Sequence, residues 1–285
     1  PNKTLLRFDD NCFGCLLLAL RAWIFLFGLF MVTLLLVIIY IAFIALGLPD
    51  SLLGSAWSVI RSDLGADMGA AGVIYFMSAI STVVSSFFSS RILHKFGTAK
   101  VTTVSILLTS IALFGYSAAP NIYIMLLSAT LLGFGAGSVD AALSGFIAMH
   151  YEARHMSWLH SFWGIGAMTG PLVMSLFLKN NRNWRGGYTV VALILFAVVV
   201  ILAVSFPLWK IFESRLDSSV SEKYMTNKMA IRLRGVKPAM AVMLLYTGAE
   251  ATMGLWIATF LIECRGVSAE DAAAFSALFY IGIIS

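Results

Sequence analysis

The chain has 285 residues, of which 60% are hydrophobic and 12% charged, and its mean hydropathy is +0.92. Soluble globular proteins are about 25% charged, so this composition excludes a water-soluble domain. The formal net charge is +5, but the basic residues are not interleaved with aromatic ones, which argues against nucleic acid as a partner. Three cysteines provide no disulfide framework. The composition predicts an integral membrane protein surrounded by lipid.

Long stretches with at most one charged residue mark the predicted membrane spans in chain order. A spanning helix needs about 20 apolar residues, and the stretch 101–139 is nearly twice that length, with a turn signal at 118–121. We therefore divide it into two spans joined by a hairpin. The stretches are 22–60, 69–90, the two parts of 101–139, 155–178, 186–209 and 238–262, followed by the start of an eighth at Ala272.

The distribution of charge predicts four parts. Residues 31–209 hold six spans and form a first six-helix repeat, whereas residues 238–285 hold the seventh span and a truncated eighth, the start of a second repeat. Between them, residues 210–237 contain 10 of the 33 charged residues (19 basic and 14 acidic) and form a charged linker. Residues 1–30 are an N-terminal tail, either not native to the protein, with Met31 as the natural start, or an extra apolar or interfacial helix. We interpret the chain as a fragment.

Orientation is predicted from lysine and arginine alone, because cytoplasmic loops carry an excess of these residues. The loops between spans two and three, four and five, and six and seven contain 11 of them, and the other loops contain 5. The first group is therefore predicted to be cytoplasmic.

Two spans share a pattern that suggests an internal repeat. Asp50 and Glu250 each lie inside a span, each is followed four residues later by a glycine, Gly54 or Gly254, and a tryptophan comes two or three residues after that. Weak symmetry between two halves is typical of secondary transporters. The repeat has a period of about 200 residues.

Three of the 14 acidic residues lie inside predicted spans: Asp50, Asp140 and Glu250. A charged side chain at the bilayer centre costs at least about 2.5–3.5 kcal/mol, so such residues usually face an internal cavity. No Lys or Arg lies within spans one to seven to neutralise them. We interpret the three acids as proton-coupling residues, since low dielectric favours a protonated carboxyl. The alternative is that the acids have a structural role. Each would then pair with a neighbouring helix or lie shallow enough to reach water, and Asp50 could hydrogen-bond the backbone freed by Pro49.

His160 and Trp163 lie one turn apart near the start of the fifth span, where they either contact a polar solute or anchor the helix at the membrane interface. The glycines at positions 133, 135, 137, 164, 166 and 170 lie within helices, so they predict close helix packing rather than a nucleotide site. We find no metal-ligand, phosphate-binding or hydrolase motif, and predict no metal, no cofactor and no enzymatic activity.

The spans, the long charged loop and the repeated opening of the second set resemble the major facilitator superfamily. Gly97 and the basic Lys95 match part of that family's loop motif between spans two and three. Leu-Pro-Asp50-Ser-Leu-Leu and Val-Asp140-Ala-Ala-Leu-Ser resemble two acidic elements of the fucose permease-like branch, which contains sugar:proton symporters. Residues 166–171 resemble part of the fifth-span motif of antiporters.

The resemblance implies an all-α bundle with a six-helix first half and the first one to two helices of a second half. It implies alternating access around a polar cavity, with Asp50 and Asp140 binding the coupling proton during uptake of a sugar or similar small polar solute. Proton-driven efflux of a lipophilic compound, and a non-transporting receptor or scaffold, stay open as alternatives. The partners would be membrane lipid, the proton and the solute, for a monomer in the cell membrane. The candidate substrate-binding residues are Tyr40, Ser144, His160, Trp163, Tyr246 and Trp256.

Overall fold

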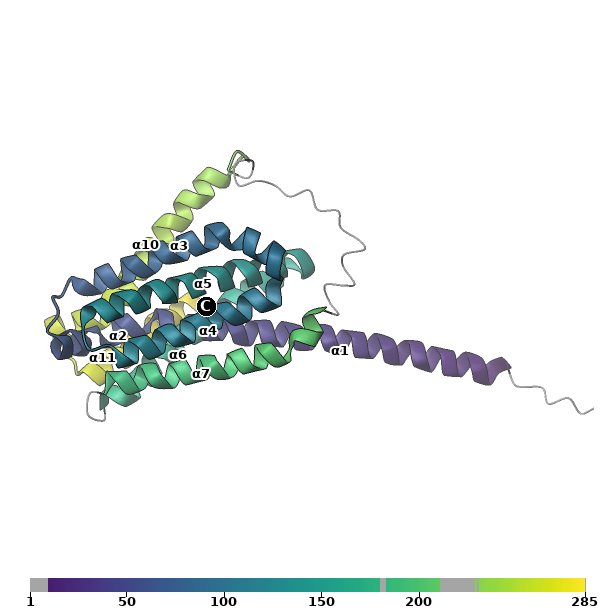
Figure 1. Cartoon of the computed structure of the whole chain (residues 1–285), viewed down its shortest axis with the longest axis horizontal. Helices are drawn as coiled ribbons and strands as arrows, with labels where there is room; N and C mark the ends of the chain where they lie inside the picture. Colours follow the sequence, from purple (N-terminus) through teal and green to yellow (C-terminus); the bar gives the residue numbers. More distant parts are fainter. Residues whose placement is uncertain (1–9, 180–182, 211–228, 230, 285) are drawn as a thin grey trace, which may run out of the picture.

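Every regular element in the described part of the chain is a helix, as predicted (Figure 1). The computed structural model describes residues 10–179, 183–210, 229 and 231–284, and the side chains of these residues except 10–25, 27 and 29. The helices are α1 (Asp10–Asp50), α2 (Leu52–Leu64), α3 (Ala70–Phe96), α4 (Thr98–Ala118), α5 (Ile122–His150), α6 (Ala153–Lys179), α7 (Trp184–Val204), α10 (Val236–Arg265) and α11 (Ala269–Ile284). The all-α fold class is therefore confirmed.

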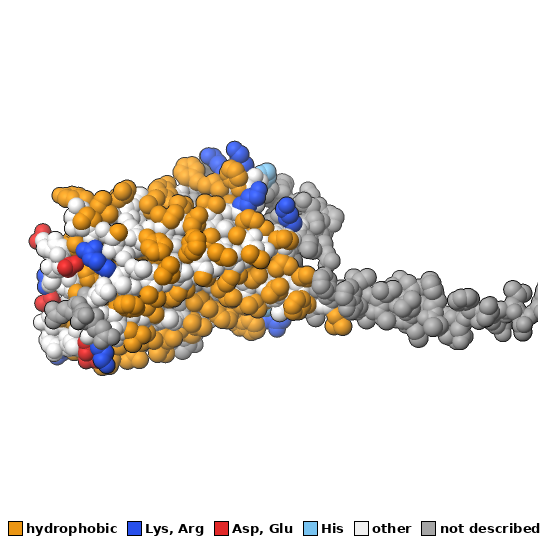
Figure 2. All heavy atoms as spheres, turned by 60° about the horizontal axis from the view of Figure 1, so that its bottom comes forward, with side chains coloured by type: hydrophobic (Ala, Val, Ile, Leu, Met, Phe, Trp, Pro, Cys, Tyr) orange, Lys and Arg blue, Asp and Glu red, His pale blue; other side chains and the backbone are white. Residues whose placement is uncertain are grey.

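Seven helical segments among the described residues are long and apolar enough to cross a membrane. The first runs from Phe30 to Leu64 through α1 and α2, and the others are α3, α4, α5, α6, α7 and α10. Figure 2 shows the matching surface, with a wide apolar band between two ends that carry the charged side chains. The 16 residues of α11 fall short of the about 20 that a full span needs.

Helix α1 is longer than the predicted first span and ends at a break. It has 41 residues, about 62 Å at 1.5 Å per residue, and Figure 1 shows its first part extending beyond the bundle. Residues 10–30, predicted to be a tail or a separate helix, continue into the span without interruption, while residues 1–9 lie outside the described part. Pro49 lacks a backbone N–H, and the helix ends at the next residue, Asp50, before α2 begins at Leu52.

The helices define two ends of the bundle. We call the end with the turns at 65–69, 119–121 and 266–268 the distal end, and the opposite end, where α7 ends and α10 begins, the linker end. Most of the predicted linker at 210–237 lies outside the described residues.

Small residues let the helices approach closely, which confirms that the glycines serve helix packing. In the α3–α5 pair, a Cβ atom at Gly133 would overlap the carbonyl oxygen of Ser78, and one at Gly137 would overlap that of Thr82. Ser85 Oγ donates to the carbonyl oxygen of Phe134 at 2.6 Å across the same interface. Close backbone approach and interhelical hydrogen bonds are the usual stabilising contacts between helices in lipid, where apolar burial provides little.

Candidate functional site

A cavity of about 710 Å³ lies between α1, α3, α5, α6, α10 and α11 and contains all three intramembrane acids. Asp50 closes the C-terminal end of α1, Asp140 lies in the middle of α5, and Glu250 lies in the middle of α10. Asp50 and Asp140 are exposed to this space and Glu250 is partly exposed. The helices thus bring together three carboxyls that are separated by up to 200 residues in the sequence.

Asp50 is held by a hydrogen bond from a neighbouring helix. The indole Nε1–H of Trp163, on α6, donates to Asp50 Oδ2 at 2.9 Å. The two helices touch through their backbones, since a Cβ atom at Gly47 would overlap the carbonyl oxygen of Trp163, and one at Gly166 would overlap that of Ile44. This contact fixes the indole beside the carboxyl, so the alternative in which Asp50 bonds only freed backbone does not describe the structure.

The other two acids have polar neighbours on their own helices. Ser144 Oγ, one turn after Asp140 on α5, donates to Asp140 Oδ1 at 3.3 Å. Tyr246 lies one turn before Glu250 on α10, and both line the cavity. Three ion pairs occur among the described residues, and none of them includes Asp50, Asp140 or Glu250. Within the described part of the chain, none of the three acids therefore forms an ion pair, although His160 lies in the same lining.

Three of the six predicted substrate-binding residues line the cavity: His160, Trp163 and Tyr246. The His160 ring meets Phe43 edge-on at a centroid distance of 6.1 Å, and both residues belong to the lining. The imidazole, the indole and the phenol therefore provide aromatic and polar surface on two sides of the space, α6 and α10.

The other three predicted residues do not line the cavity. Tyr40 is 7% exposed, stacks on Phe162 and shares a 2.8 Å hydrogen bond with His155 Nδ1, so its hydroxyl is used within the protein. Trp256 packs against the hydrophobic core. Ser144 lies outside the lining but reaches it indirectly through its bond to Asp140. The structure places Tyr40 and Trp256 outside this lining, because a sequence pattern alone does not fix how a helix is rotated against its neighbours.

Several lining residues escaped the sequence analysis. Tyr75 on α3 and Tyr280 on α11 contribute phenol rings, and Thr82, Ser157, Ser161 and Thr247 contribute hydroxyl groups. A hydroxyl inside a charge-free span was the available signal, but many such residues serve helix packing instead, as Ser85 does.

Helices α2 and α10 are in contact at the distal end of the bundle. They cross at the two glycines of the predicted repeat, where a Cβ atom at Gly54 would overlap the carbonyl oxygen of Gly254. About two turns further on, Arg61 Nη2 donates to Glu263 Oε1 at 2.7 Å. We refer to Gly54, Arg61, Gly254 and Glu263 as the α2–α10 contact.

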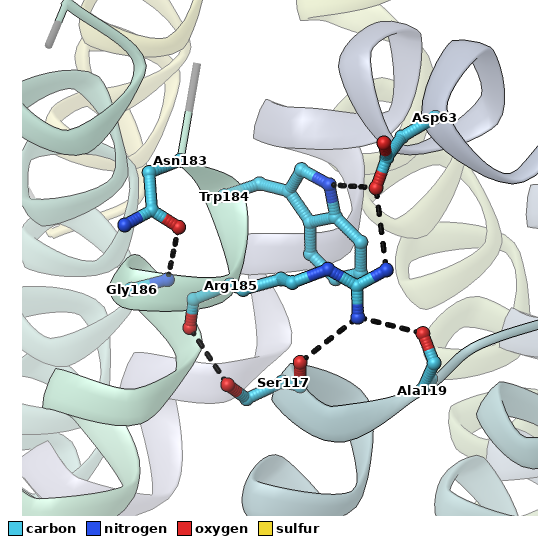
Figure 3. Close-up of polar contacts among 7 residues, drawn as sticks. All are labelled: Asp63, Ser117, Ala119, Asn183, Trp184, Arg185 and Gly186. Atoms are coloured by element: carbon cyan, nitrogen blue, oxygen red, sulfur yellow. Dashed lines mark hydrogen bonds and ion pairs between the residues drawn. The ribbon is translucent and has the colours of Figure 1, made fainter. Parts of the chain in front are cut away.

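A second polar cluster at the same end joins α2, α7 and the turn after α4 (Figure 3). Asp63 Oδ2 accepts from Trp184 Nε1 at 3.1 Å and from Arg185 Nη2 at 3.2 Å. Arg185 Nη1 also donates to the carbonyl oxygens of Ser117 and Ala119, at 3.0 and 2.7 Å. One guanidinium thus satisfies a carboxylate and two carbonyl groups at the end of a helix.

The linker-side half of α10 is exposed, by contrast. Residues 237–249 of α10 are all exposed, whereas its buried residues, Leu255, Ala258 and Thr259, lie in the distal half. Figure 1 shows the first part of α10 standing away from the rest of the bundle. The cavity therefore lies on the linker side of the α2–α10 contact, with α10 diverging from the other helices there.

Membrane-spanning helices arranged around a cavity that holds three carboxyls are typical of a multi-pass membrane protein of the transporter class. The family model of the major facilitator superfamily matches residues 39–285, and the chain belongs to this superfamily. Its curated relatives are named as transporters and not as enzymes. The closer resemblance to the fucose permease-like branch stays a prediction.

Three curated relatives show how similar the chain is to named transporters. The chain is 26% identical over 145 residues to the glucose/mannose transporter of Bacillus subtilis, covering 50% of this chain and 34% of that protein. It is 27% identical over 135 residues to the niacin transporter of Acinetobacter baylyi, covering 46% and 30%. A transporter of the acurin A biosynthesis cluster of Aspergillus aculeatus is 24% identical over 202 residues, covering 66% and 35%. The chain thus spans about a third of the length of these relatives.

A solved structure shares the fold. The crystal structure of a D-xylose-proton symporter superimposes with a TM-score of 0.59 and 13% sequence identity, over 90% of this chain and 66% of that one.

Proposed function

We propose that the protein is a proton-coupled transporter that takes up a sugar or similar small polar solute by alternating access. The observation that carries the proposal is the set of three carboxyls in one cavity, Asp50, Asp140 and Glu250, none of which forms an ion pair among the described residues. Burying a carboxyl in a membrane is costly, and a residue that must gain and lose a proton during a cycle explains why that cost is tolerated.

In this proposal the chain contributes the first six-helix half and the opening helices of the second half. The predicted repeat supports this division, because Gly54 and Gly254 meet where the two sets of helices cross. Alternating access then requires the two sets to rock against each other around the cavity between them. The protein acts as a monomer in the lipid bilayer of the cell membrane.

The basic loops support an orientation as well. The linker end, where the basic loops lie, faces the cytoplasm in the proposed topology. The cavity then opens to the cytoplasm, and the α2–α10 contact closes it from the outside. In the opposite state that contact would separate and solute would enter from the distal end.

The proposed roles follow from the lining. Asp50 and Asp140 bind and release the coupling proton, and Glu250 provides a third proton site on the second set of helices. His160, Trp163 and Tyr246 contact the solute, since aromatic faces suit sugar rings and ring nitrogens and hydroxyls hydrogen-bond their hydroxyl groups. The glucose/mannose transporter among the relatives supports a sugar as the first solute to test.

The test is transport by the full-length protein in liposomes with an imposed pH gradient, acidic outside, and labelled D-glucose as the first probe. We expect uphill uptake with alkalinisation of the medium. Asp50→Asn and Asp140→Asn should each abolish uphill uptake, at least 100-fold, while counterflow exchange persists because it needs no net proton transfer. The control is Glu152→Gln, since Glu152 pairs with Arg154 outside the cavity and is mostly exposed.

Two outcomes would overturn the proposal. Uphill uptake at the normal rate in both Asp variants would remove the proton-coupling role. Proton-driven export of a lipophilic dye, with no uptake of sugars or other small polar solutes, would favour the efflux alternative.

A further inference from the structure

The Trp163 indole occupies a distinctive position at the end of α1. It donates to Asp50 Oδ2 from α6 at 2.9 Å, and the two helices are in backbone contact on either side of it, at Gly47 and Gly166. A side chain placed this way has little freedom to move from the carboxyl without separating the helices.

We propose that Trp163 is a positioning residue for the proton-binding carboxyl of Asp50, in addition to being part of the cavity wall. The indole N–H donates and cannot accept, so Oδ2 stays an acceptor in both protonation states. The proton therefore adds to Oδ1, giving a neutral carboxylic acid whose Oδ2 still accepts the indole hydrogen bond, and leaves from the same oxygen. This inference rests on the proposed proton coupling.

Asp50 has other titratable neighbours, which any pH measurement must separate from it. They line the same cavity from every helix packed around it: Tyr75 on α3, Asp140 on α5, His160 on α6, Tyr246 and Glu250 on α10, and Tyr280 on α11. Of the hydrogen bonds found among the described residues, the one to the Asp50 carboxyl comes from Trp163. Removing that donor therefore changes the environment of Asp50 more directly than that of the others.

The experiment is infrared difference spectroscopy on the full-length protein as a function of pH, with no substrate present. The C=O band of the protonated Asp50 carboxyl is identified as the band that Asp50→Asn removes. Trp163 is replaced by 3-benzothienylalanine, which keeps the ring shape but has sulfur in place of N–H, and separately by Phe. The matched control is the same sulfur isostere at Trp184, which loses an equivalent indole bond to Asp63 at the distal end.

The hydrogen bond that the indole donates is stronger to an ionised carboxylate than to a neutral carboxyl, so it favours the ionised form of Asp50. Without it we expect the midpoint of the Asp50 band to move upward by about one to two pH units in both Trp163 variants. The C=O frequency should rise as well, because Oδ2 loses its donor. The Trp184 control should leave both the midpoint and the frequency unchanged, although it lowers stability as much.

The outcomes separate this inference from the proposed function. If no carboxyl band disappears in Asp50→Asn, Asp50 does not titrate and its proton-coupling role is wrong. If the band is present but neither its midpoint nor its frequency differs in the isostere variant, Trp163 is not a positioning residue while proton coupling stands. The Phe variant gives a second reading where the isostere protein is produced poorly.

Discussion

The crossing of α2 and α10 gives the sharpest test of how the cavity is closed. At Gly54 an added Cβ atom would overlap the carbonyl oxygen of Gly254 and lie 2.8 Å from Leu255 Cα and 2.9 Å from Leu255 O. All three are backbone atoms, so no side-chain rotation relieves the overlap and the helices must separate. Overpacking of this kind costs about 1–3 kcal/mol. Applied to the closed distal end alone, that energy shifts the ratio of open to closed molecules by about 5- to 150-fold.

Gly54→Ala is therefore expected to open the distal end. The assay measures how fast a membrane-impermeant thiol reagent, added outside cells, labels a cysteine in the cavity. The reporter is Ser161→Cys on α6, in a protein whose three native cysteines are replaced by Ser. We expect labelling at least fivefold faster in Gly54→Ala than in the parent.

The matched control for this prediction is Gly248→Ala, also a helical glycine, on α10. A Cβ atom there has no neighbour within 4 Å among the described residues. Equal labelling rates in Gly54→Ala, Gly248→Ala and the parent would refute the conclusion that this crossing closes the cavity.

Two further predictions concern the distal end. Arg61→Glu is expected to speed labelling of the same reporter only about two- to fivefold, because the Arg61–Glu263 pair is partly exposed, with side chains 28% and 39% accessible. The double variant Arg61→Glu, Glu263→Arg should restore the slow rate, and failure to restore it would show that the pair does not act as a unit. Arg185→Gln is expected to lower the melting temperature of the detergent-solubilised protein by several degrees, because two carbonyl groups lose the guanidinium and Asp63 loses one of its two donors. Lys179→Gln, a loss of charge at an exposed position, is the control, and equal melting temperatures would contradict the role of the cluster.

The predicted repeat shows how far a sequence pattern reaches. The spacing of Asp50 to Gly54 and of Glu250 to Gly254 singled out four residues without any spatial information. The structure brings the two glycines into contact and leaves both acids one turn away in the cavity. What the spacing could not indicate was that the glycines meet each other, because a pattern along one helix does not identify the helix packed against it.

For the candidate site, too, the sequence identified some of the residues and could not place others. Asp140 and Glu250 were predicted only from the free-energy cost of placing a charge in lipid. An acid there must face a polar interior whatever the details of packing. Tyr40 was predicted to contact the solute, yet it is buried against Phe162 and His155. The break in the helix after Pro49 explains part of the difference between the two residues, because Asp50 ends α1 whereas Tyr40 lies inside it.

The sequence by itself predicted that the chain is a membrane protein, where its candidate spans lie, and which carboxyls lie inside those spans. These properties depend on composition and length along a single helix. Only the tertiary structure decided which side chains share the cavity, that Trp163 bonds Asp50, and that α2 and α10 meet at Gly54 and Gly254. Those features depend on the rotation and tilt of each helix relative to its neighbours. In lipid, rotation and tilt are set by close packing of small residues and by interhelical hydrogen bonds rather than by burial of an apolar face.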